Sequence, residues 1–516
     1  MTQDTNALLT SLVEGYNFTS DSLDLGVALI DGKVEPTAPI RLPLKMLNRH
    51  GLVAGATGTG KTVTLQLMAE QLSKAGVPVF LADIKGDLSG LAQEAVASEK
   101  LTARLAEQGK EFEPRANPVE FLSLGEGTHG TPVRASVDAF GPILLARVLE
   151  LNETQEECLQ LIFHYADSNK LPLDDLSDVK SVISYLLSDQ GAEALKNLGG
   201  VSSATASVIL RGITIMQSQG LDQFFGQPEF DTSDFLQVRE DGNGVINVLE
   251  LPSVNSQPML FSTFLMWLLA DLFEDLPEAG DLDKPKLVFF LDEAHLLFKD
   301  ATKAFTDSII NTVRLIRSKG VGLFFITQSP TDLPDEVLGQ LGNRIQHAVR
   351  VFTAKDQSAL KKIIQTFPTN GVDLQEALTQ AGVGEAVITV LGEKGSPTPV
   401  AWTKMSSPGS NIGPASPEVL DANLKASPLA ARYAAAVDRE SAREMLDAKV
   451  APPAATPESA PEQAPAEQHE QSAPRQQRAP KAEQNPMMDM AVDAATMIGR
   501  ELIRGMFGNR KRRRRW

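Results

Sequence analysis

Apolar residues follow two patterns along this chain, short continuous runs and stretches in which they return every three or four positions. The first pattern indicates buried strands, and the second indicates helices with one buried face. Two such runs, 52–54 and 77–82, enclose a helical stretch over 63–72. Strand, helix and strand in this order indicate a βαβ unit and therefore a parallel sheet. Later runs predict further strands at 245–251, 287–291 and 321–327.

The stretch from about residue 140 to residue 236 has helical spacing almost throughout. It predicts a helical insertion between two halves of the sheet. The most apolar window, 259–273, is interrupted by polar residues such as Asp271 and is too short to span a bilayer, so we expect a buried helix there. The helices expected in the insertion cover 144–151, 154–165, 177–187 and 204–216.

Regular patterns weaken after about residue 407, and 451–486 consists mostly of Ala, Pro, Glu and Gln, which is typical of a disordered linker. Helical spacing returns over 487–507 and predicts an amphipathic helix that either docks on a partner or packs back on its own chain. The expected segments are a short β-rich segment over 1–45, the first part of the α/β core over 46–139, a helical insertion over 140–240, the second part of the core over 241–407, a helical extension over 408–450, the linker over 451–486, and the helix with its basic end over 487–516.

Length and composition limit the class of protein. With 516 residues and 42% hydrophobic residues, the chain can bury a large core in two or three structural units. Its single cysteine, Cys158, excludes an intramolecular disulfide framework and a Cys-rich zinc site, and is more simply a small buried apolar residue. The N-terminus lacks a basic region followed by an apolar core, so we expect no secretory signal and a soluble, cytoplasmic protein.

Charge is distributed unevenly along the chain. A formal net charge of −18 repels nucleic acid on average. The last residues, 509–516, nevertheless form a dense cationic block. Such a block binds nucleic-acid phosphates, an anionic membrane surface or an acidic protein partner, or it is a solvated tail without a dedicated partner.

The loop after the run 52–54 matches the pattern G-x-x-x-x-G-K-[ST] in full. This is the Walker A sequence, in which small residues let backbone N–H groups point at phosphates near a helix N-terminus. Lys61 is expected to reach the β- and γ-phosphates, and the Thr62 hydroxyl is expected to ligate Mg²⁺. A dinucleotide-binding turn is the alternative, but it has no use for a Lys-Thr pair, and its G-x-G-x-x-G spacing is absent. The predicted phosphate-binding residues are Gly55, Ala56, Thr57, Gly58, Thr59, Gly60, Lys61 and Thr62.

Two acids follow the apolar run 287–291, as expected of a Walker B element. Asp292 is expected to hold Mg²⁺, and Glu293 to orient or activate the attacking water. Two acids after a strand also occur in ordinary turns, so the full Walker A sequence is what favours the functional interpretation.

Polar residues on either side of the run 321–327 are further candidates for the site. Gln328 either contacts the γ-phosphate or the attacking water, or belongs to a turn. In a ring-shaped assembly, Arg317 could neutralise charge on the γ-phosphate of a neighbouring subunit, with Arg314 as a weaker candidate. Either arginine could equally be a solvated helix residue.

Several motifs together resemble the HerA-type branch of the HerA/FtsK ATPases, and most of all the bacterial HerA-like proteins of uncharacterised function. The resemblance extends over about residues 40 to 405. It implies a RecA-like core, usually a hexameric ring, that binds ATP and Mg²⁺ and translocates on double-stranded DNA. The first 50 residues are too short for the N-terminal barrel domain associated with HerA, so docking of a nuclease partner is not implied. The motifs are GATGTGKT at 55–62, DIKGD at 83–87, FFLDEAH at 289–295, RSKGVGLFFITQSP at 317–330 and LGNRI at 341–345.

The resemblance also implies roles for individual residues. Asp83 is the acid that follows the second strand and belongs to the nucleotide site, and Asp87 and His295 are supporting residues. The remaining roles fall on Lys61, Thr62, Asp292, Glu293, Gln328 and, as a finger acting in trans, Arg317.

Two functions are compatible with these motifs, because conjugation and secretion ATPases share a similar core. The first is a ring-forming DNA translocase or helicase. The second is an ATPase that remodels or assembles a protein or membrane-surface partner, docked through the basic C-terminal block. Dependence of ATP turnover on DNA separates them.

Overall fold

The computed structural model describes residues 3–125, 129–251, 258–298, 303–369 and 371–450 of the chain. The linker expected over 451–486 and the helix and basic end expected over 487–516 lie outside the described residues and stay predictions. The segment boundaries proposed for the rest of the chain stay predictions as well.

Twelve strands of the described residues form one sheet, in the order β2-β1-β12-β11-β10-β3-β9-β8-β4-β7-β5-β6. Pairing is parallel from β10 to β6, and antiparallel where β11, β12, β1 and β2 extend the sheet. This confirms the predicted α/β class with a large parallel sheet. The strands are β1 (Ser22–Ile30), β2 (Lys33–Pro43), β3 (Gly51–Ala54), β4 (Val79–Asp83), β5 (Val119–Ser123), β6 (Thr131–Pro132), β7 (Ile246–Glu250), β8 (Leu287–Leu291), β9 (Val321–Thr327), β10 (Asn343–His347), β11 (Glu385–Thr389) and β12 (Ala401–Met405).

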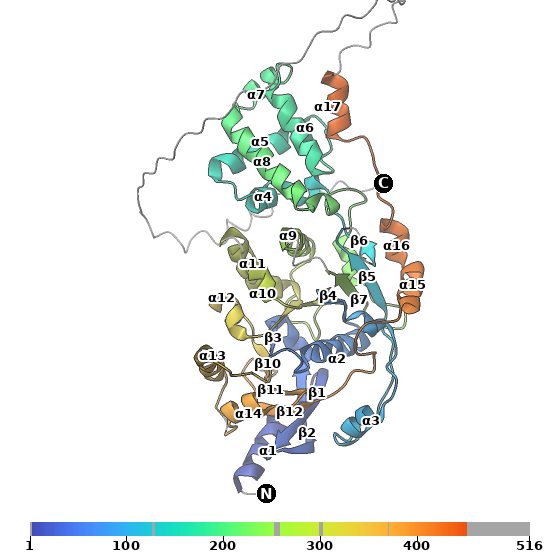
Figure 1. Ribbon diagram of the computed structural model, residues 1–516, viewed down its shortest axis with the longest axis vertical. Coiled ribbons are helices and arrows are strands. Elements are labelled where there is room, and N and C mark those ends of the chain that lie inside the picture. The colour runs from blue at the N-terminus through green and yellow to red at the C-terminus, as the bar shows by residue number, and fades with distance from the viewer. Residues whose placement is uncertain (1–2, 126–128, 252–257, 299–302, 370, 451–516) are drawn as a thin grey trace, which may run out of the picture.

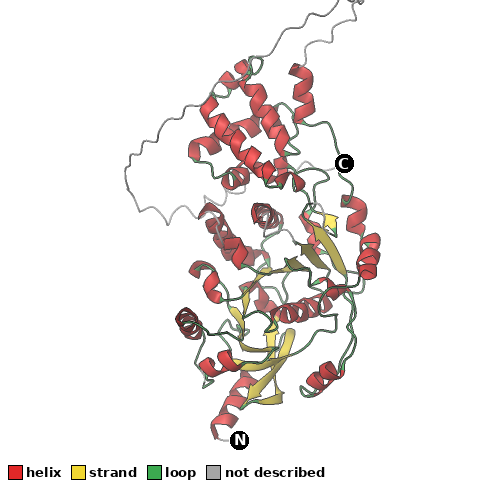
Figure 2. Cartoon of the chain, viewed as in Figure 1, coloured by secondary structure: helices red, strands yellow, loops and turns green. Residues whose placement is uncertain are grey.

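Helices cover both faces of the sheet (Figure 2). They are α1 (Gln3–Gly15), α2 (Lys61–Lys74), α3 (Glu99–Ala106), α4 (Val137–Val148), α5 (Glu153–Ser168), α6 (Leu176–Leu187), α7 (Ala192–Asn197), α8 (Ser203–Ser218), α9 (Pro258–Asp275), α10 (His295–Phe298), α11 (Lys303–Leu315), α12 (Asp335–Leu338), α13 (Ala354–Gln365), α14 (Leu374–Gln380), α15 (Pro417–Ala426), α16 (Pro428–Tyr433) and α17 (Ala442–Val450).

Side chains that alternate along the central strands divide the core between the two faces of the sheet. Phe290 and Phe324 belong to the cluster that includes Met68 of α2, whereas Phe289 and Phe325 belong to the cluster that includes Phe264 of α9. Neighbouring residues of a strand point to opposite faces, so a continuous apolar run supplies both clusters. This is why β3 and β8, in the middle of the sheet, carry no polar residue.

The helices α4 to α8, called here the helical segment, form a group at one end of the molecule, while α1, β1 and β2 lie at the other end (Figure 1). The chain then returns through α15 and α16 to α17, which packs against α6. The backbone N–H of Ala442 donates to the carbonyl oxygen of Pro172 at 2.9 Å, which joins this return to the helical segment.

The first residues differ from the β-rich segment expected over 1–45. Two paired strands, β1 and β2, are present, but they follow a helix, α1, that the pattern did not predict. This helix is mostly polar and covers the strands through few apolar side chains, with Leu12 buried. Just after the helix, the Tyr16 hydroxyl contacts the carbonyl oxygens of Ile388 and Pro399 at 3.1 and 2.9 Å, so contacts far along the chain fix this segment.

The apolar helix expected over 259–273 is α9, and its Phe264 and Trp267 are fully buried. Among the helices that the structure describes, none is both long enough and apolar enough to span a membrane.

Candidate nucleotide site

The Walker A loop joins the end of β3 to the start of α2 and is fixed by the neighbouring strands. The N–H of Gly55 donates to the carbonyl oxygen of Thr327 at 3.3 Å, and that of Ala56 to Ala348 at 2.9 Å. Gly55 has a φ of 152°, and a Cβ there would lie 2.5 Å from the Cβ of His347. The loop therefore needs glycine at this position both for its backbone conformation and for its approach to β10.

The N-terminus of α2 has no side-chain cap. Its N-cap residue, Gly60, has a φ of 114° and makes no side-chain hydrogen bond to the helix. Other helices of the chain begin at residues whose side chains accept a hydrogen bond from the first turn, among them Ser98, Ser136 and Asn152. An uncapped first turn leaves backbone donors and the positive end of the helix dipole for an anion. This loop thus fits the phosphates of a nucleotide.

Lys61 is buried and lies over the loop that it follows. Its Nζ donates to the carbonyl oxygens of Gly55 at 2.6 Å and Ala56 at 3.2 Å. Burial lowers the pKa of Lys61, and the nearby charges of Glu293 and Asp292 act in the opposite direction. The Lys61 ammonium group is therefore held beside the position where the loop would receive phosphates.

The Walker B acids lie in the turn between β8 and α10. Asp292 is 4% exposed, and its Oδ1 accepts the N–H of Glu293 at 2.9 Å. Its Oδ2 and the Oε2 of Glu293 are buried without a hydrogen-bond partner in the protein. Burial raises the pKa of Asp292 to about 6, against which the charge of Lys85 acts.

These unpaired oxygens fit a magnesium ion with its water ligands. Magnesium prefers carboxylate and hydroxyl oxygens, and it keeps several waters that need acceptors nearby. Asp292 supplies such an acceptor at the end of β8, and Thr62 supplies a hydroxyl in the first turn of α2. The residues present therefore fit the predicted cofactor, magnesium together with ATP.

The order of the strands brings these elements to one edge of the sheet. β9 lies between β3, which leads to the Walker A loop, and β8, which leads to the acids. The N–H of Ala294 donates to the carbonyl oxygen of Ile326 at 2.8 Å, which attaches the acidic turn to β9. Gln328, the residue after β9, is exposed between the two halves of the site. Its predicted contact with the γ-phosphate or the water stays a prediction.

Both carboxylate oxygens of Asp83 accept hydrogen bonds from the turn that follows it. Its Oδ1 accepts the N–H groups of Lys85 and Gly86 at 3.1 and 2.8 Å, and its Oδ2 accepts that of Leu88 at 2.9 Å. Burial raises the pKa of Asp83. The observed contacts hold the turn after β4, whereas direct contact with a nucleotide stays a prediction.

Arg317 lies at the other edge of the sheet, in the 3-10 turn Ile316–Lys319 before β9, and it is exposed. The seven residues of β9 separate it from the edge that carries the Walker loops, called here the catalytic edge. Their length is about 23 Å at roughly 3.3 Å per residue. Arg317 therefore cannot serve the site of its own chain. Action on a neighbouring subunit stays a prediction, as it does for Arg314.

Two residues at the site had no predicted role. His347, at the end of β10, donates from Nδ1 to the carbonyl oxygen of Glu385 at 2.8 Å and accepts at Nε2 from the Thr64 hydroxyl at 3.0 Å. Burial lowers its pKa to about 4, so this neutral histidine ties α2 to the sheet. Lys85, within the DIKGD motif, lies 2.6 Å from Glu293. Neither contact follows from spacing along the chain, because each joins segments distant in sequence.

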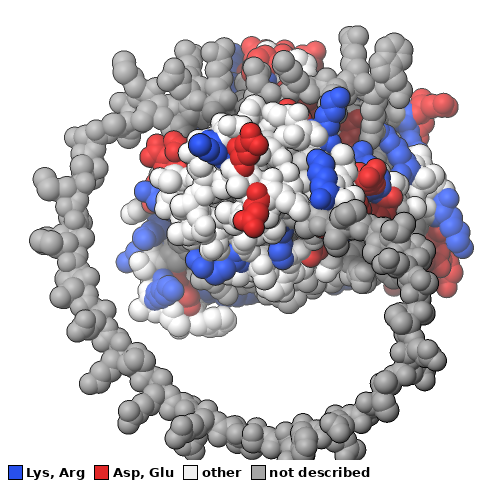
Figure 3. All heavy atoms as spheres, turned by 90° about the horizontal axis from the view of Figure 1, so that it is seen from above, with Lys and Arg blue, Asp and Glu red and all other residues white. Residues whose placement is uncertain are grey.

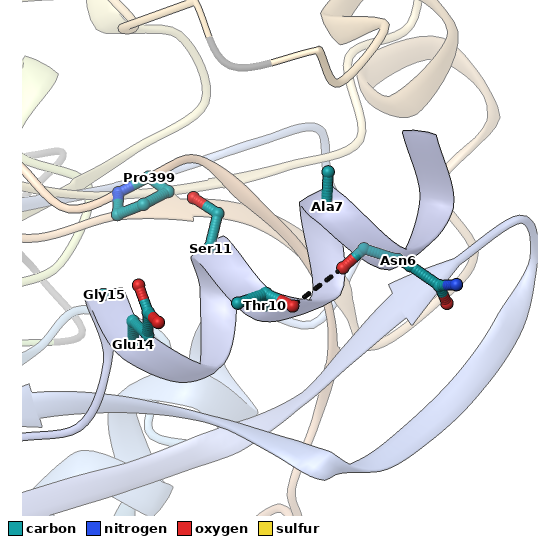
Figure 4. Close-up of a pocket in the computed structure, with 7 residues that line it drawn as sticks. All are labelled: Asn6, Ala7, Thr10, Ser11, Glu14, Gly15 and Pro399. Carbon is teal, nitrogen blue, oxygen red and sulfur yellow. Dashed lines mark hydrogen bonds between the residues drawn. The ribbon is translucent and has the colours of Figure 1, made fainter. Parts of the chain in front are cut away.

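A surface pocket elsewhere shares no residue with this site (Figure 4). It lies along α1, where Thr10 donates to the carbonyl oxygen of Asn6 at 3.0 Å. Glu14 is the single ionisable side chain among the residues that line it. These residues lack the grouping of charged and polar side chains found at the Walker loops.

Comparison with known proteins agrees with the site. A family described as "Helicase HerA-like C-terminal" matches residues 29–515. The DNA double-strand break repair helicase HerA of Sulfurisphaera tokodaii is 24% identical over 383 residues, which are 72% of this chain and 67% of that protein. HerA of Saccharolobus solfataricus is 23% identical over 70% of this chain and 66% of its own length. The chain thus spans about two thirds of the length of these relatives.

Among solved structures, the bacterial conjugative coupling protein TrwBdeltaN70, in its trigonal form with sulphate, has a similar fold. The TM-score is 0.50 at 14% identity, over 79% of this chain and 93% of that one. At this identity the likeness concerns the fold alone. The family match covers most of the chain and includes both Walker elements. The chain belongs to the HerA-like helicase family and is a P-loop ATPase.

Proposed function

We propose that this ATPase is a motor that moves along double-stranded DNA as a hexameric ring of identical subunits. The observation that carries the proposal is that the residues expected to hydrolyse ATP follow neighbouring strands on one edge of the sheet, in a chain whose relatives are named as DNA repair helicases. Oligomerisation would also give Arg317 a γ-phosphate to contact, since its own site is out of reach.

Each side chain at the catalytic edge has a role in ATP hydrolysis. The Walker A loop and Lys61 bind the phosphates, while Thr62 and Asp292 hold magnesium, which when bound neutralises phosphate charge. Glu293 orients the water and accepts its proton. The water oxygen bonds to the γ-phosphorus as the bond from that phosphorus to the β–γ bridging oxygen breaks, and ADP leaves with the electron pair. In this scheme Gln328, exposed just after β9, contacts the water or the γ-phosphate.

A short connection leads from the nucleotide to the surface of the molecule. The N–H of Ala56 in the Walker A loop bonds to Ala348, which directly follows β10. Four residues further on, Phe352 precedes α13 and is 86% exposed. A shift of the Walker A loop on nucleotide binding would therefore move the start of α13. This is the type of coupling that a motor needs.

Helix α13 and the residues just before it present basic side chains. Arg350, Lys355, Lys361 and Lys362 are exposed. The acid in this stretch, Asp356, accepts hydrogen bonds from the N–H groups of Phe352 and Thr353 at the helix N-terminus. We call these four basic residues the α13 surface. Its charge suits the phosphate backbone of DNA, and the exposed ring of Phe352 adds an apolar contact.

At the opposite end of the molecule, the described residues carry charges of both signs (Figure 3). Figure 3 views this end from above, and both Lys or Arg and Asp or Glu side chains are visible around the helical segment. A surface of mixed sign does not neutralise a row of phosphates. The α13 surface is therefore the better candidate for DNA within the described residues, despite a formal net charge of −18 for the whole chain.

The double substitution Lys361→Ser, Lys362→Ser tests this assignment. Binding of a long DNA duplex, measured by fluorescence anisotropy at several salt concentrations, should weaken. The slope of log affinity against log salt should fall in magnitude by about two, since each lost phosphate contact removes about one. An equal loss of charge elsewhere, Lys196→Ser with Lys425→Ser, should leave the slope unchanged.

An unchanged slope in the α13 variant would remove that surface from the proposal. The alternative function, an ATPase docked on a protein or membrane partner through the basic C-terminal block, predicts that ATP turnover depends on that partner. ATP turnover would then ignore DNA, rise with vesicles that contain phosphatidylserine, and lose that response when Arg510 to Trp516 are deleted.

A further inference from the structure

Lys85 contacts both acids of the Walker B turn, although it comes from a different strand end. Its Nζ lies 2.6 Å from Oε1 of Glu293 and 3.9 Å from Oδ2 of Asp292. The second of these oxygens has no hydrogen-bond partner in the protein. The hydrolysis scheme above gives Lys85 no task, so its position requires a separate explanation.

The turn after β4 determines where Lys85 lies. Asp83 accepts the N–H groups of Lys85, Gly86 and Leu88, and Gly86 adopts a φ of 72°. The side chain of Lys85 is 42% exposed, whereas those of Asp292 and Glu293 are 4% and 10% exposed. The cation of Lys85 thus reaches two buried acids from the solvent side. It belongs to the turn after β4, whereas the acids belong to the turn after β8.

Two adjacent buried carboxylates need a cation for electrostatic reasons. Removing two like charges from water and holding them next to each other costs free energy. The ammonium group of Lys85 lies close enough to both acids to offset this cost. It also holds the carboxylate of Glu293, whose other oxygen lies 3.3 Å from Nδ1 of His295. Glu293 is itself in the left-handed region, with a φ of 45°. A carboxylate held in this way is not free to accept a proton from water.

We propose that Lys85 is the counter-cation of the resting site, which holds Glu293 and occupies the electrostatic place of magnesium beside Asp292, and which the incoming magnesium nucleotide displaces. This inference rests on the proposed hydrolysis at the same site. It makes Lys85 a positioning residue that competes with magnesium, and it gives the DIKGD turn a function in delaying hydrolysis until the nucleotide is fully bound.

Magnesium dependence of nucleotide binding tests the competition without any need for turnover. A fluorescent ADP analogue is held at fixed concentration with the full-length protein while free magnesium is varied. Lys85→Met keeps the length of the side chain but removes its charge, and it should lower the half-saturating magnesium concentration by about tenfold. Lys85→Arg keeps the charge and should stay within about twofold of the unaltered protein.

A matched control is Lys74→Met, at a lysine of the same domain that pairs 4.0 Å from Glu113 on the surface. It should not change the magnesium requirement. As a second readout, magnesium alone should raise the melting temperature of Lys85→Met more than that of the unaltered protein, because an empty pair of acids binds the ion better. This readout also reports whether the variant folds.

The outcomes separate the inference from the proposed function. A lower magnesium requirement in Lys85→Met, with Lys85→Arg unchanged, is the expected result. If the unaltered protein binds magnesium ADP and the requirement of Lys85→Met is unchanged or higher, Lys85 is not a competitor and the inference is wrong. Failure of the unaltered protein to bind the analogue at all would overturn the proposed function, and the inference with it.

Discussion

The catalytic edge of the sheet and the helical segment both bury acidic side chains, but they treat them differently. At the edge, Asp292 and Glu293 each keep one buried oxygen without a hydrogen-bond partner. In the helical segment, Asp178 accepts the N–H groups of Asp174 and Asp175 at 2.8 and 3.0 Å and that of Arg443 at 3.0 Å. We call an acid open when one of its buried oxygens accepts no hydrogen bond, even where a cation lies nearby as Lys85 does, and closed when both oxygens accept hydrogen bonds.

The presence or absence of hydrogen-bond partners separates acids that stabilise the fold from acids expected to bind a ligand, and burial alone does not. A buried polar atom without a partner costs free energy, so it persists where a ligand supplies the partner. Both oxygens of Asp174 accept hydrogen bonds from Arg439, from Nη2 at 2.6 Å and from Nε at 2.7 Å, and this pair holds the C-terminal return in place. Substitutions in the two regions should therefore affect different properties.

The largest effect is expected at the open acid. Glu293→Gln removes the group that we propose accepts the proton from water, so kcat for ATP hydrolysis should fall by about 10³-fold. ADP binding and the melting temperature should change little, because the side chain keeps its size. The exposed Glu440 provides the control, and Glu440→Gln should hydrolyse ATP at the original rate. Loss of folding in Glu293→Gln would show that this acid is structural after all.

A smaller effect is expected at His347, which lies at the catalytic edge but has a hydrogen-bond partner at each ring nitrogen. Its substitution should therefore affect stability, as substitutions in the helical segment do. Burial lowers the pKa of His347 to about 4, below its ordinary value of 6.5. The unfolded chain therefore binds a proton that the folded chain does not, and stability should fall as the pH drops from 6.5 toward 4. The contribution of this residue reaches at most about 3 kcal/mol at pH 4.

Chemical denaturation at pH 7 and pH 4.5 measures this loss. His347→Asn should lose less stability between the two pH values than the unaltered protein, while the exposed His164→Gln should show the full loss. Equal pH dependence in all three proteins would mean that His347 does not stay neutral in the folded state.

The smallest effect is expected at the closed acid. Arg439→Ala removes a two-pronged ion pair that is half exposed on the arginine side, and should lower the free energy of unfolding by about 1–2 kcal/mol without changing ATP turnover. Arg443→Ala loses an ion pair with its partly exposed neighbour Glu444, and should cost less than about 0.5 kcal/mol in the same denaturation experiment. A change in turnover for Arg439→Ala would tie the C-terminal return to the catalytic edge.

Much of the fold was predictable because buried strands leave a clear pattern. The strands expected at 287–291 and 321–327 are β8 and β9 with the same bounds, since both are uninterrupted apolar runs between polar residues. The helix α1 was missed because it is mostly polar. Helix α4 starts earlier than the expected 144–151, because Ser136 caps a first turn that Gly141 and Pro142 then interrupt.

The residues of the site were also predictable only in part. Lys61 and Glu293 stand in motifs that are continuous in sequence, so their positions follow from the strand that precedes each. Lys85 and His347 act on partners far along the chain, and no spacing predicts those contacts. Predicting them requires knowing which strand ends lie side by side, which the order of strands in the folded sheet determines.

The central claim, that ATP hydrolysis at this edge drives movement on DNA, is tested most directly by steady-state ATPase measurements. The protein and Glu293→Gln are assayed with and without long double-stranded DNA, at two salt concentrations. The account predicts that DNA stimulates turnover strongly, that higher salt weakens the stimulation, and that the variant abolishes it. Robust turnover that ignores DNA at both salt concentrations would contradict the account.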